Sequence, residues 1–426
     1  MTETEQVQQN TQVTFYGLGI APGLLAALDG LGYVSPTPIQ SQSIPIAIEG
    51  KDIVGIAQTG TGKTLAFGIP MLQTLAREKG QGLVVVPTRE LALQVNEQLQ
   101  SVGRSAGLRS AVLIGGQSMG PQMRELRSRP HILVVTPGRL IDHLRQKTLG
   151  LQSVRVLVLD EADRMLDMGF LPQMKTILSA VPAKRQTMLF SATLSSAIMR
   201  IATDYMQFPV RIEIAPSGTT VERVSQEIFV VGREEKPRQL LKVLAERGGS
   251  VLVFTRTKYG ASRLARMIRG AGETCAELHS NRSLGQRRDA LDGFKIGKYR
   301  VLVATDIASR GIDVQGIELV LNYDLPAQSE DYVHRIGRTA RAGAAGHAIS
   351  FALPNEKRGI RAIESFIKKS IRISEISPLA GGAREERPAR PPRSPRVAYA
   401  AGRGRPETRD RGFRRPHRRA GRGRRF

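Results

Sequence analysis

Short apolar runs alternate with amphipathic stretches through the first half of the chain. In the stretches between the runs, apolar residues recur every three or four positions, which is typical of helices packed on one side. Runs of this kind, apolar on both faces and separated by helices, predict a parallel sheet covered on both sides. The runs are Ile53–Ile56, Leu83–Val86, Ala111–Ile114, Ile132–Val135, Val156–Leu159 and Thr187–Phe190.

The same alternation restarts in the second half, after a polar stretch that contains Pro209, Pro216 and Gly218. The later runs are Glu227–Val231, Val251–Phe254, Thr274–Leu278, Val301–Val303, Leu319–Leu321 and Ala348–Phe351. The pattern therefore predicts two tandem α/β domains of similar design, over residues 14–210 and 226–375, joined by a linker at 211–225.

Both ends of the chain differ from this pattern. Residues 1–13 are polar and we expect them to be disordered. Residues 381–426 hold 16 arginines, no lysine and 4 acidic residues, with many Gly and Pro. Such a segment cannot bury enough apolar surface to offset the entropy of ordering. We therefore expect residues 376–426 to form a disordered basic tail.

The charge of the whole chain indicates a polyanionic partner. It has 63 basic and 38 acidic residues, a net charge of +25 and a pI near 10.9. A surplus of this size favours nucleic acid or an anionic membrane surface. No run approaches 18 apolar residues, and the N-terminus is not a signal sequence, so we expect no membrane association and a cytoplasmic protein. Cys275 is the one cysteine, which excludes a disulfide framework and a cysteine metal cage.

A phosphate-binding loop follows the first apolar run. Glycines at a strand-to-helix turn let backbone N–H groups point at phosphate oxygens, at the positive end of a helix. Lys63 can reach the outer phosphates, and the Thr64 hydroxyl can hold Mg²⁺. An ordinary Gly/Thr-rich surface loop is the alternative, and the Gly-x-Gly-Lys-Thr spacing argues against it. The predicted nucleotide contacts are Ala57, Gln58, Thr59, Gly60, Thr61, Gly62, Lys63 and Thr64.

Two adjacent acids, Asp160 and Glu161, end a later apolar run of the same domain. In a parallel sheet, ligands bind at the carboxyl ends of the strands. Asp160 can hold Mg²⁺ through water, and Glu161 can orient and deprotonate an attacking water. Two acids alone would favour a solvated turn, but beside a phosphate loop the catalytic interpretation is preferred.

Asp160-Glu161-Ala162-Asp163, together with the phosphate loop and Ser191-Ala192-Thr193, resembles the motifs of the DEAD-box RNA helicases. Further motifs of that family follow in its order through most of residues 15–352. The resemblance implies two RecA-like domains, ATP and Mg²⁺ as cofactors, and RNA as substrate. The extended sequence and the basic tail look most like the bacterial RhlE-type branch. We expect the tail, residues 376–426, to bind RNA electrostatically as a tether, with a merely solubilising basic extension as the alternative.

The resemblance also assigns residues to ligands. Gln40, with Phe15 upstream, is similar to the segment that reads adenine. RNA-backbone contacts are implied for Pro87, Thr88, Arg89, Gly116, Thr136, Pro137, Gly138 and Arg139 in the first domain and for Arg256 and Thr305 in the second. These residue types suit phosphates and sugars rather than base edges, so binding should be largely independent of sequence.

His334–Arg341 resembles the family's motif VI. Arg338 and Arg341 are three residues apart, so on one helical turn both guanidinium groups can face the transferring phosphate. By the resemblance, Asp306 takes the ribose or joins the two domains. His334 links the second domain to Asp163, Ser191 and Thr193.

Three positions depart from the family pattern. Ser280 follows His279 where the family often has Gly, Leu284 replaces a usual Gln, and Ala340 stands where Gly is frequent. None removes a group that would bind phosphate or metal.

The sequence therefore predicts an ATP-dependent RNA helicase that unwinds short duplexes and remodels RNA or RNA–protein complexes, with ribosomal or RNA-decay complexes as candidate partners. Three alternatives are a DNA translocase of the same superfamily, a non-enzymatic RNA-binding scaffold, and an annealing factor dominated by its basic tail.

Overall fold

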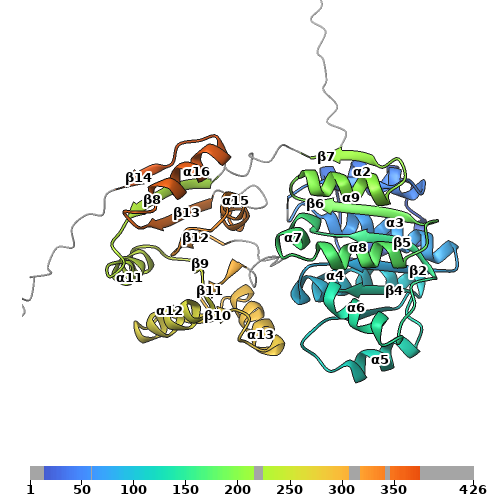
Figure 1. Ribbon diagram of the computed structural model, residues 1–426, viewed down its shortest axis with the longest axis horizontal. Helices are drawn as coiled ribbons and strands as arrows, with labels where there is room; N and C mark the ends of the chain where they lie inside the picture. Colours follow the sequence, from blue (N-terminus) through green and yellow to red (C-terminus); the bar gives the residue numbers. More distant parts are fainter. Residues whose placement is uncertain (1–13, 59, 215–223, 307–316, 341–345, 375–426) are drawn as a thin grey trace, which may run out of the picture. The chain divides into compact units, whose positions relative to one another are not determined.

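Two seven-stranded sheets organise the described part of the chain (Figure 1). The computed structural model describes residues 14–58, 60–214, 224–306, 317–340 and 346–374. The predicted N-terminal segment 1–13 and basic tail 376–426 lie outside these residues. Every strand pair in both sheets is parallel, which confirms the predicted α/β class.

The first sheet has the strand order β3-β4-β2-β5-β6-β1-β7. Its inner strands are buried on both faces because helices cover both sides. The strands are β1 (Ile53–Ile56), β2 (Gln81–Val85), β3 (Ser110–Leu113), β4 (Ile132–Val135), β5 (Val154–Leu159), β6 (Gln186–Ser191) and β7 (Val210–Glu213).

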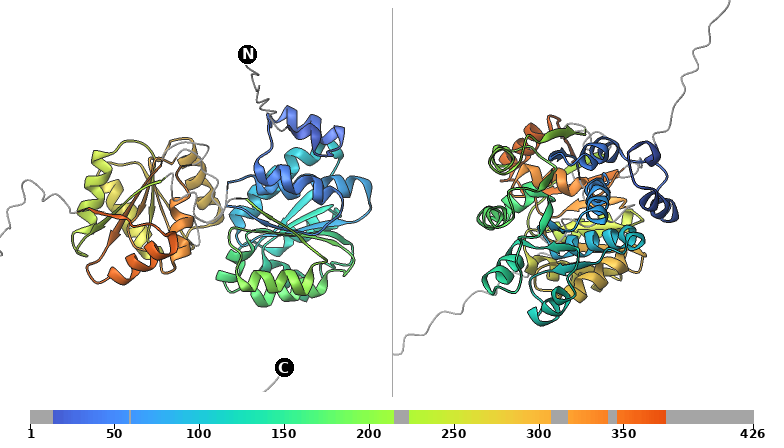
Figure 2. Two further views of the ribbon diagram at one scale, coloured as in Figure 1. Left: turned by 90° about the horizontal axis from the view of Figure 1, so that it is seen from above. Right: turned by 90° about the vertical axis from the view of Figure 1, so that its right-hand side faces the viewer.

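Two apolar cores lie on the two sides of this sheet. One core contains side chains from α1 to α4, such as Phe67 and Val95, and the other contains side chains from α6 to α9, such as Met165 and Ile198. Figure 2 shows the blue helices on one side of the sheet and the green helices on the other. The helices are η1 (Phe15–Gly17), α1 (Pro22–Gly30), α2 (Pro38–Ile48), α3 (Lys63–Arg77), α4 (Arg89–Gly103), η2 (Arg104–Ala106), α5 (Met119–Arg127), α6 (Pro137–Arg145), α7 (Ala162–Asp167), α8 (Leu171–Ala180) and α9 (Ser196–Tyr205).

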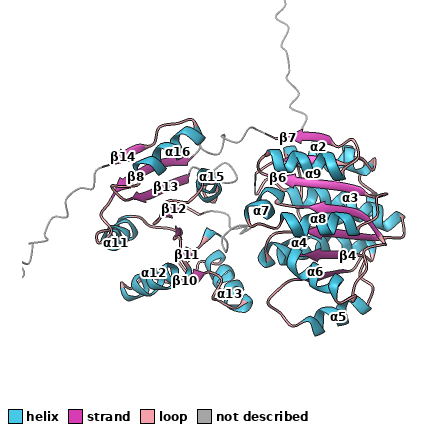
Figure 3. Ribbon diagram, in the orientation of Figure 1, coloured by secondary structure: helices cyan, strands magenta, loops and turns pink. Residues whose placement is uncertain are grey.

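The second sheet repeats this design with the order β10-β11-β9-β12-β13-β8-β14. Figure 3 shows its strands alternating with helices along the chain. The strands are β8 (Val224–Val230), β9 (Val251–Phe254), β10 (Cys275–Leu278), β11 (Val301–Ala304), β12 (Leu319–Asn322), β13 (Gly346–Ala352) and β14 (Arg372–Ser374). The described helices are α11 (Lys236–Glu246), α12 (Lys258–Gly270), α13 (Leu284–Lys295), α15 (Ser329–Ile336) and α16 (Lys357–Ile367).

The register of the first sheet brings three loops together. Strand β6 lies between β1 and β5, with Ile56 level with Ser191 and Leu159 level with Leu189. Because the strands are parallel, the loops that follow β1, β5 and β6 meet at one edge of the sheet. These loops carry the predicted phosphate loop, the two acids and Thr193.

The domain boundaries differ from the predicted ones. Residues 210–213 form β7, which pairs with β1 and belongs to the first sheet, so the predicted linker 211–225 begins too early. It also ends too late, because Val224 and Ser225 already pair with β13 in the second sheet. Strand β7 is an edge strand in which only Ile212 is buried, and its polar sequence therefore reads as a linker.

Candidate active site

The predicted phosphate loop connects β1 to α3. Gly60 and Gly62 have φ of +87° and +88°, a region in which a side chain would be strained. The Lys63 amine is buried and donates a hydrogen bond to the carbonyl oxygen of Ala57 at 2.9 Å, while the Thr61 hydroxyl donates to the carbonyl of Gln58. The loop is thus curled around its own lysine. Thr59 lies outside the described residues.

Gln40 connects the segment before α2 to this loop. Its side-chain nitrogen donates to the carbonyl of Gly62 at 3.0 Å, and its side-chain oxygen accepts the N–H of Thr37 at 2.8 Å. A Cβ atom on Gly62 would lie 2.4 Å from that Gln40 nitrogen, so this contact also requires glycine. The predicted adenine-reading residue and the predicted phosphate loop are therefore in direct contact.

Phe15 lies in the apolar core of the first domain and is only 2% exposed. Its ring offers little free surface to a ligand, and its predicted contact with the nucleotide stays a prediction. Tyr33, in the segment that leads to Gln40, is only partly buried and its hydroxyl accepts a hydrogen bond from Gln98. No role is predicted for Tyr33 from the sequence, although an aromatic residue so near Gln40 is a signal for one.

The two predicted catalytic acids are buried where β5 ends. Burial is the main cause that raises the pKa of Asp160 to about 6, against the lowering effect of the Lys63 ammonium. Burial would also raise the pKa of Glu161, but Arg164, Lys63 and Arg338 together lower it. An ion pair of 2.7 Å joins Glu161 to Arg164, a residue to which the sequence analysis gave no role.

Glu161 has a left-handed backbone conformation, with φ +52° and ψ +50°, at the residue that precedes α7. A non-glycine residue in this region is strained, and such strain concentrates at functional sites. The turn places the carboxylates of Glu161 and Asp163 on the same pocket.

Asp163 ties the β5 loop to the β6 loop. One of its carboxylate oxygens accepts hydrogen bonds from the N–H groups of Ala192 and Thr193, both at 2.9 Å, and from the Thr193 hydroxyl at 3.1 Å. The Ser191 hydroxyl donates to the carbonyl oxygen of Thr193. The structure thus brings together Asp163, Ser191 and Thr193, three of the residues predicted to couple the domains.

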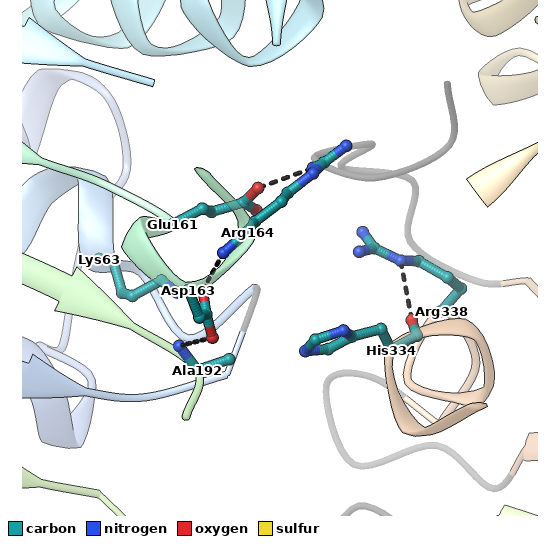
Figure 4. Close-up of a pocket in the computed structure, with 7 residues that line it drawn as sticks. All are labelled: Lys63, Glu161, Asp163, Arg164, Ala192, His334 and Arg338. Carbon is teal, nitrogen blue, oxygen red and sulfur yellow. Dashed lines mark hydrogen bonds and ion pairs between the residues drawn. The ribbon is translucent and has the colours of Figure 1, made fainter. Parts of the chain in front are cut away.

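One pocket collects these groups with two residues of the second domain (Figure 4). Its lining residues are Lys63, Glu161, Asp163, Arg164, Ala192, His334 and Arg338. Figure 4 shows Arg338 and His334 on the side of the pocket opposite Glu161 and Asp163, with Arg338 hydrogen-bonded to the carbonyl of His334. Carboxylates, the Lys63 ammonium and guanidinium groups therefore line the same pocket.

The prediction that Arg338 and Arg341 share a helical turn is wrong for Arg338. Helix α15 ends at Ile336, and Arg338 lies in the turn that follows. Arg341 lies outside the described residues. Arg338 therefore lines the pocket from a turn and not from a helix.

Asp306 is held by Arg335, which donates to both of its carboxylate oxygens at 2.5 and 2.7 Å. Arg335 is buried, also donates to Asn322 and to the carbonyl of Asp324, and lies 5.0 Å from the ring of Phe254. Arg335 lies within the predicted motif VI, but no role is predicted for it from the sequence. Its position fixes Asp306 inside the second domain.

The predicted RNA contacts of the first domain lie at the ends of β2, β3 and β4. The hydroxyl of Thr88 caps α4, and Thr136 and Pro137 begin α6. A Cβ atom on Gly116 would lie 1.9 Å from the Arg89 guanidinium, so the loop after β3 closes directly over this arginine. Pro87, Gly138 and Arg139 complete the group, and Arg139 is buried with one guanidinium nitrogen on the carbonyl of Gln117.

The predicted RNA contacts of the second domain lie at the ends of β9 and β11. The side chain of Arg256 is 57% exposed and reaches Glu356 and the carbonyl of Leu325, both at 3.3 Å. Thr305 follows β11, and its N–H donates to the carbonyl of Leu278. Both residues are at the carboxyl edge of their sheet, where ligands of parallel sheets bind.

Within the described residues, no helix is both long and apolar enough to cross a membrane. The same residues contain no group of three or more His, Cys, Asp or Glu side chains arranged to hold a metal ion.

Comparison with known proteins gives matches over both domains. The family model described as "DEAD/DEAH box helicase" matches residues 37–201, and the model "Helicase conserved C-terminal domain" matches residues 235–343. The chain is 43% identical over 362 residues to the ATP-dependent rRNA helicase RRP3 of Debaryomyces hansenii, covering 84% of this chain and 76% of that protein. It is also 43% identical over 362 residues to the DEAD-box ATP-dependent RNA helicase CshA of Bacillus licheniformis, covering 84% and 74%.

Solved structures give the same result at the level of the fold. Dbp5 of S. cerevisiae bound to RNA and ADP BeF3 superposes with a TM-score of 0.76 at 30% identity, covering 85% of this chain and 95% of that chain.

Proposed function

The chain belongs to the DEAD-box ATP-dependent RNA helicases, and on that premise we propose how its own residues divide the work and on which RNA it acts. A helicase of this family hydrolyses ATP and acts on RNA. The observation that carries the residue assignment is the pocket in which Lys63, Glu161, Asp163 and Arg338 meet.

Lys63 and the backbone of residues 57–62 hold the phosphates in this proposal. When ATP enters, the Lys63 amine exchanges the carbonyl of Ala57 for the outer phosphates. Glu161, whose lowered pKa keeps it ionised at neutral pH, accepts a proton from the attacking water. Arg338 and Arg341 offset the charge that develops on the transferred phosphoryl group.

The residues present fit Mg²⁺. Burial raises the pKa of the Asp160 carboxyl despite the nearby Lys63 ammonium, and a cation beside the carboxylate would favour its ionised form. Mg²⁺ usually takes one or two carboxylates together with substrate phosphates, so no cage of protein ligands is needed. Asp160 and Thr64 would hold the ion, which supplies positive charge beside the phosphates.

RNA lies, in our proposal, across the carboxyl edges of both sheets. The first domain offers residues 87–89, Gly116 and residues 136–139, and the second offers Arg256 and Thr305. Backbone amides, hydroxyls and guanidinium groups suit phosphates and sugars, so the contact is largely independent of base sequence.

We place the protein in the bacterial RhlE-like branch and in the cytoplasm, acting on RNA of ribosomal or decay complexes. The Arg-rich composition of residues 376–426 supports the branch. The name of the relative RRP3, a helicase of rRNA, supports ribosomal RNA as substrate. Sedimentation of the tagged protein with ribosomal particles, before and after ribonuclease treatment, tests the partner.

The assignment of Glu161 is tested by ATP hydrolysis with and without RNA, in the native chain and in Glu161→Gln. Loss of a general base reduces turnover by roughly 10²–10⁴-fold, and we expect this loss with RNA binding retained. The matched control is Glu125→Gln, on the exposed surface of α5, which should behave as the native chain.

Two outcomes would contradict the proposal. RNA binding without stimulated hydrolysis in the native chain would favour a scaffold that uses the nucleotide as a clamp. Equal stimulation by DNA and RNA of the same length would favour a translocase without RNA preference.

A further inference from the structure

Helix α12 carries a basic face that none of the predicted RNA contacts uses. The helix contains four basic residues, Lys258, Arg263, Arg266 and Arg269, and no acidic residue. Its apolar side packs into the core of the second domain through Ala261, Leu264, Ala265 and Ile268. The charges are therefore confined to the opposite, solvent-exposed side.

Three residues form one stripe on that side, which we call the α12 stripe: Tyr259, Arg263 and Arg266. They are spaced by four and three positions, so they follow one another along a single face of the helix. Tyr259 is 72% exposed, and both arginines are exposed. At a rise of about 1.5 Å per residue, the stripe is about 10 Å long.

Within the described part of the chain, neither Arg263 nor Arg266 forms an ion pair, whereas Arg269 lies 3.6 Å from Glu277. Two acids, Asp324 and Glu234, influence the pKa of Tyr323 together with Arg263. Asp324 is itself in an ion pair with Lys236. Because the stripe contains two arginines and α12 contains no acidic residue, the stripe is positive.

The stripe continues from a predicted RNA contact. Arg256 lies at the end of β9, directly before Thr257, whose hydroxyl caps α12. An RNA strand that leaves Arg256 therefore meets the start of α12. Tyr259 comes first along this path, with the Lys258 ammonium 5.3 Å from its ring centroid.

We propose that the α12 stripe is a second RNA-binding surface, which holds single-stranded RNA beyond the nucleotides bound at the carboxyl edge of the sheet. Exposed arginines at regular spacing match a phosphate backbone, and an exposed ring offers a face on which an unpaired base can stack. This inference rests on the proposed course of RNA past Arg256. It adds a track of contacts that only a longer RNA can reach.

The test compares the binding of a short RNA of about 10 nucleotides with that of a long RNA of about 30, by fluorescence anisotropy on the full chain. In Arg263→Gln/Arg266→Gln we expect five- to tenfold weaker binding of the long RNA and unchanged binding of the short one. Each lost phosphate contact on a single strand lowers the slope of log affinity against log salt by about 0.7, so the double variant should lose about 1.4. ATP turnover at saturating RNA should be unchanged.

A matched control exists in the same domain. Arg358→Gln/Arg361→Gln removes the same two charges, at the same spacing, from the exposed face of α16. We expect this control to keep most of the affinity and slope for the long RNA. Equal effects of the two double variants would overturn the proposal, because the loss would then follow from net charge alone.

Tyr259 separates stacking from charge. Tyr259→Ala should weaken binding of the long RNA about tenfold, with little change in the salt dependence of binding. Tyr259→Phe should bind the long RNA as the native chain does, because the ring is kept. If Tyr259→Phe binds as weakly as Tyr259→Ala, stacking is excluded. If short RNA fails to stimulate hydrolysis in the native chain, the proposed function fails instead, and that result is independent of the α12 variants.

Discussion

Ala340 has a backbone conformation that costs an alanine free energy. Its φ is +54°, in the left-handed region, at a position where the family often has glycine. A Cβ in this region costs about 1 kcal/mol or more relative to glycine. The departure that the sequence shows at this position is therefore a local strain, located between Arg338 and the strand β13.

We expect Ala340→Gly to raise the free energy of unfolding of the native protein by about 0.5–1 kcal/mol, since relief of strain outweighs the added freedom of the unfolded chain. Chemical denaturation measures it. The control is Ala271→Gly, at the C-cap of α12 with φ −86°, where no strain is relieved and stability should fall. A loss of stability in both variants would show that Ala340 is not strained.

Glu277 is a buried carboxylate in the otherwise apolar strand β10. Burial acts to raise its pKa, but hydrogen bonds from Ser262, His279 and Arg282 outweigh burial and lower the pKa to about 2. His279 lies 2.9 Å away and Arg282 forms an ion pair with it. The carboxylate thus holds the loop between β10 and α13.

Because the pKa of Glu277 is lower in the folded protein than in the unfolded chain, its carboxylate stabilises the fold at any pH above the unfolded-state pKa. This stabilisation is lost as the pH falls toward 2. Glu277→Gln should have a lower free energy of unfolding than the native chain, and we expect this difference to be about 1 kcal/mol smaller at pH 4 than at pH 7. Denaturation at both pH values measures the change. Glu246→Gln, on the exposed side of α11, should show no such dependence; a constant deficit for Glu277→Gln would exclude ionisation as the source.

At the scale of elements, the first sheet depends on a buried aspartate, Asp52, which directly precedes β1. The Asp52 carboxylate accepts the N–H of Thr187, in β6, at 2.6 Å and the N–H of Gln207, before β7, at 2.7 Å. Gln207 leads into an edge strand with one buried side chain. Asp52 therefore attaches the edge of the sheet to its centre.

Asp52→Ala leaves two backbone donors without partners, and hydrogen bonds to charged groups each contribute about 1.5–3 kcal/mol. We expect a loss of at least 2 kcal/mol, with amide exchange accelerated most in Val210–Glu213. Asp52→Asn, which keeps an acceptor oxygen, should recover part of the loss. Exchange that accelerates uniformly over the whole first sheet would contradict a local attachment.

The same elements show what the sequence could and could not predict. Buried strands such as β1 and β5 were predicted because their residues are apolar on both faces, and the edges β7 and β14 were missed because theirs are not. The positions of Asp160 and Asp163 follow from the rule that parallel strands share a carboxyl edge, and the position of Lys63 follows from the glycine spacing of the phosphate loop. Arg164 and Arg335 could not be predicted as the partners of Glu161 and Asp306, because a hydrogen bond between side chains leaves no periodic pattern in the sequence.

For the whole molecule, charge is divided between the folded domains and the tail. Residues 381–426 account for +12 of the net charge of +25, whereas every residue proposed to bind ATP precedes residue 381. RNA binding through counterion release depends on the number of phosphates neutralised, whereas phosphoryl transfer depends on groups inside the pocket. The two activities should therefore separate when the tail is removed.

Deletion of residues 381–426 should weaken RNA binding and lower the steepness of its salt dependence, while maximal ATP turnover at saturating RNA is retained. Anisotropy at several salt concentrations and a turnover assay on the same preparations measure both. Replacement of the 16 arginines by lysine is the control, because it keeps the charge and should keep the slope. If the deletion variant keeps the native slope of log affinity against log salt, the tail does not contact phosphates. The excess charge of the two domains, including the α12 stripe, would then account for all electrostatic binding of RNA.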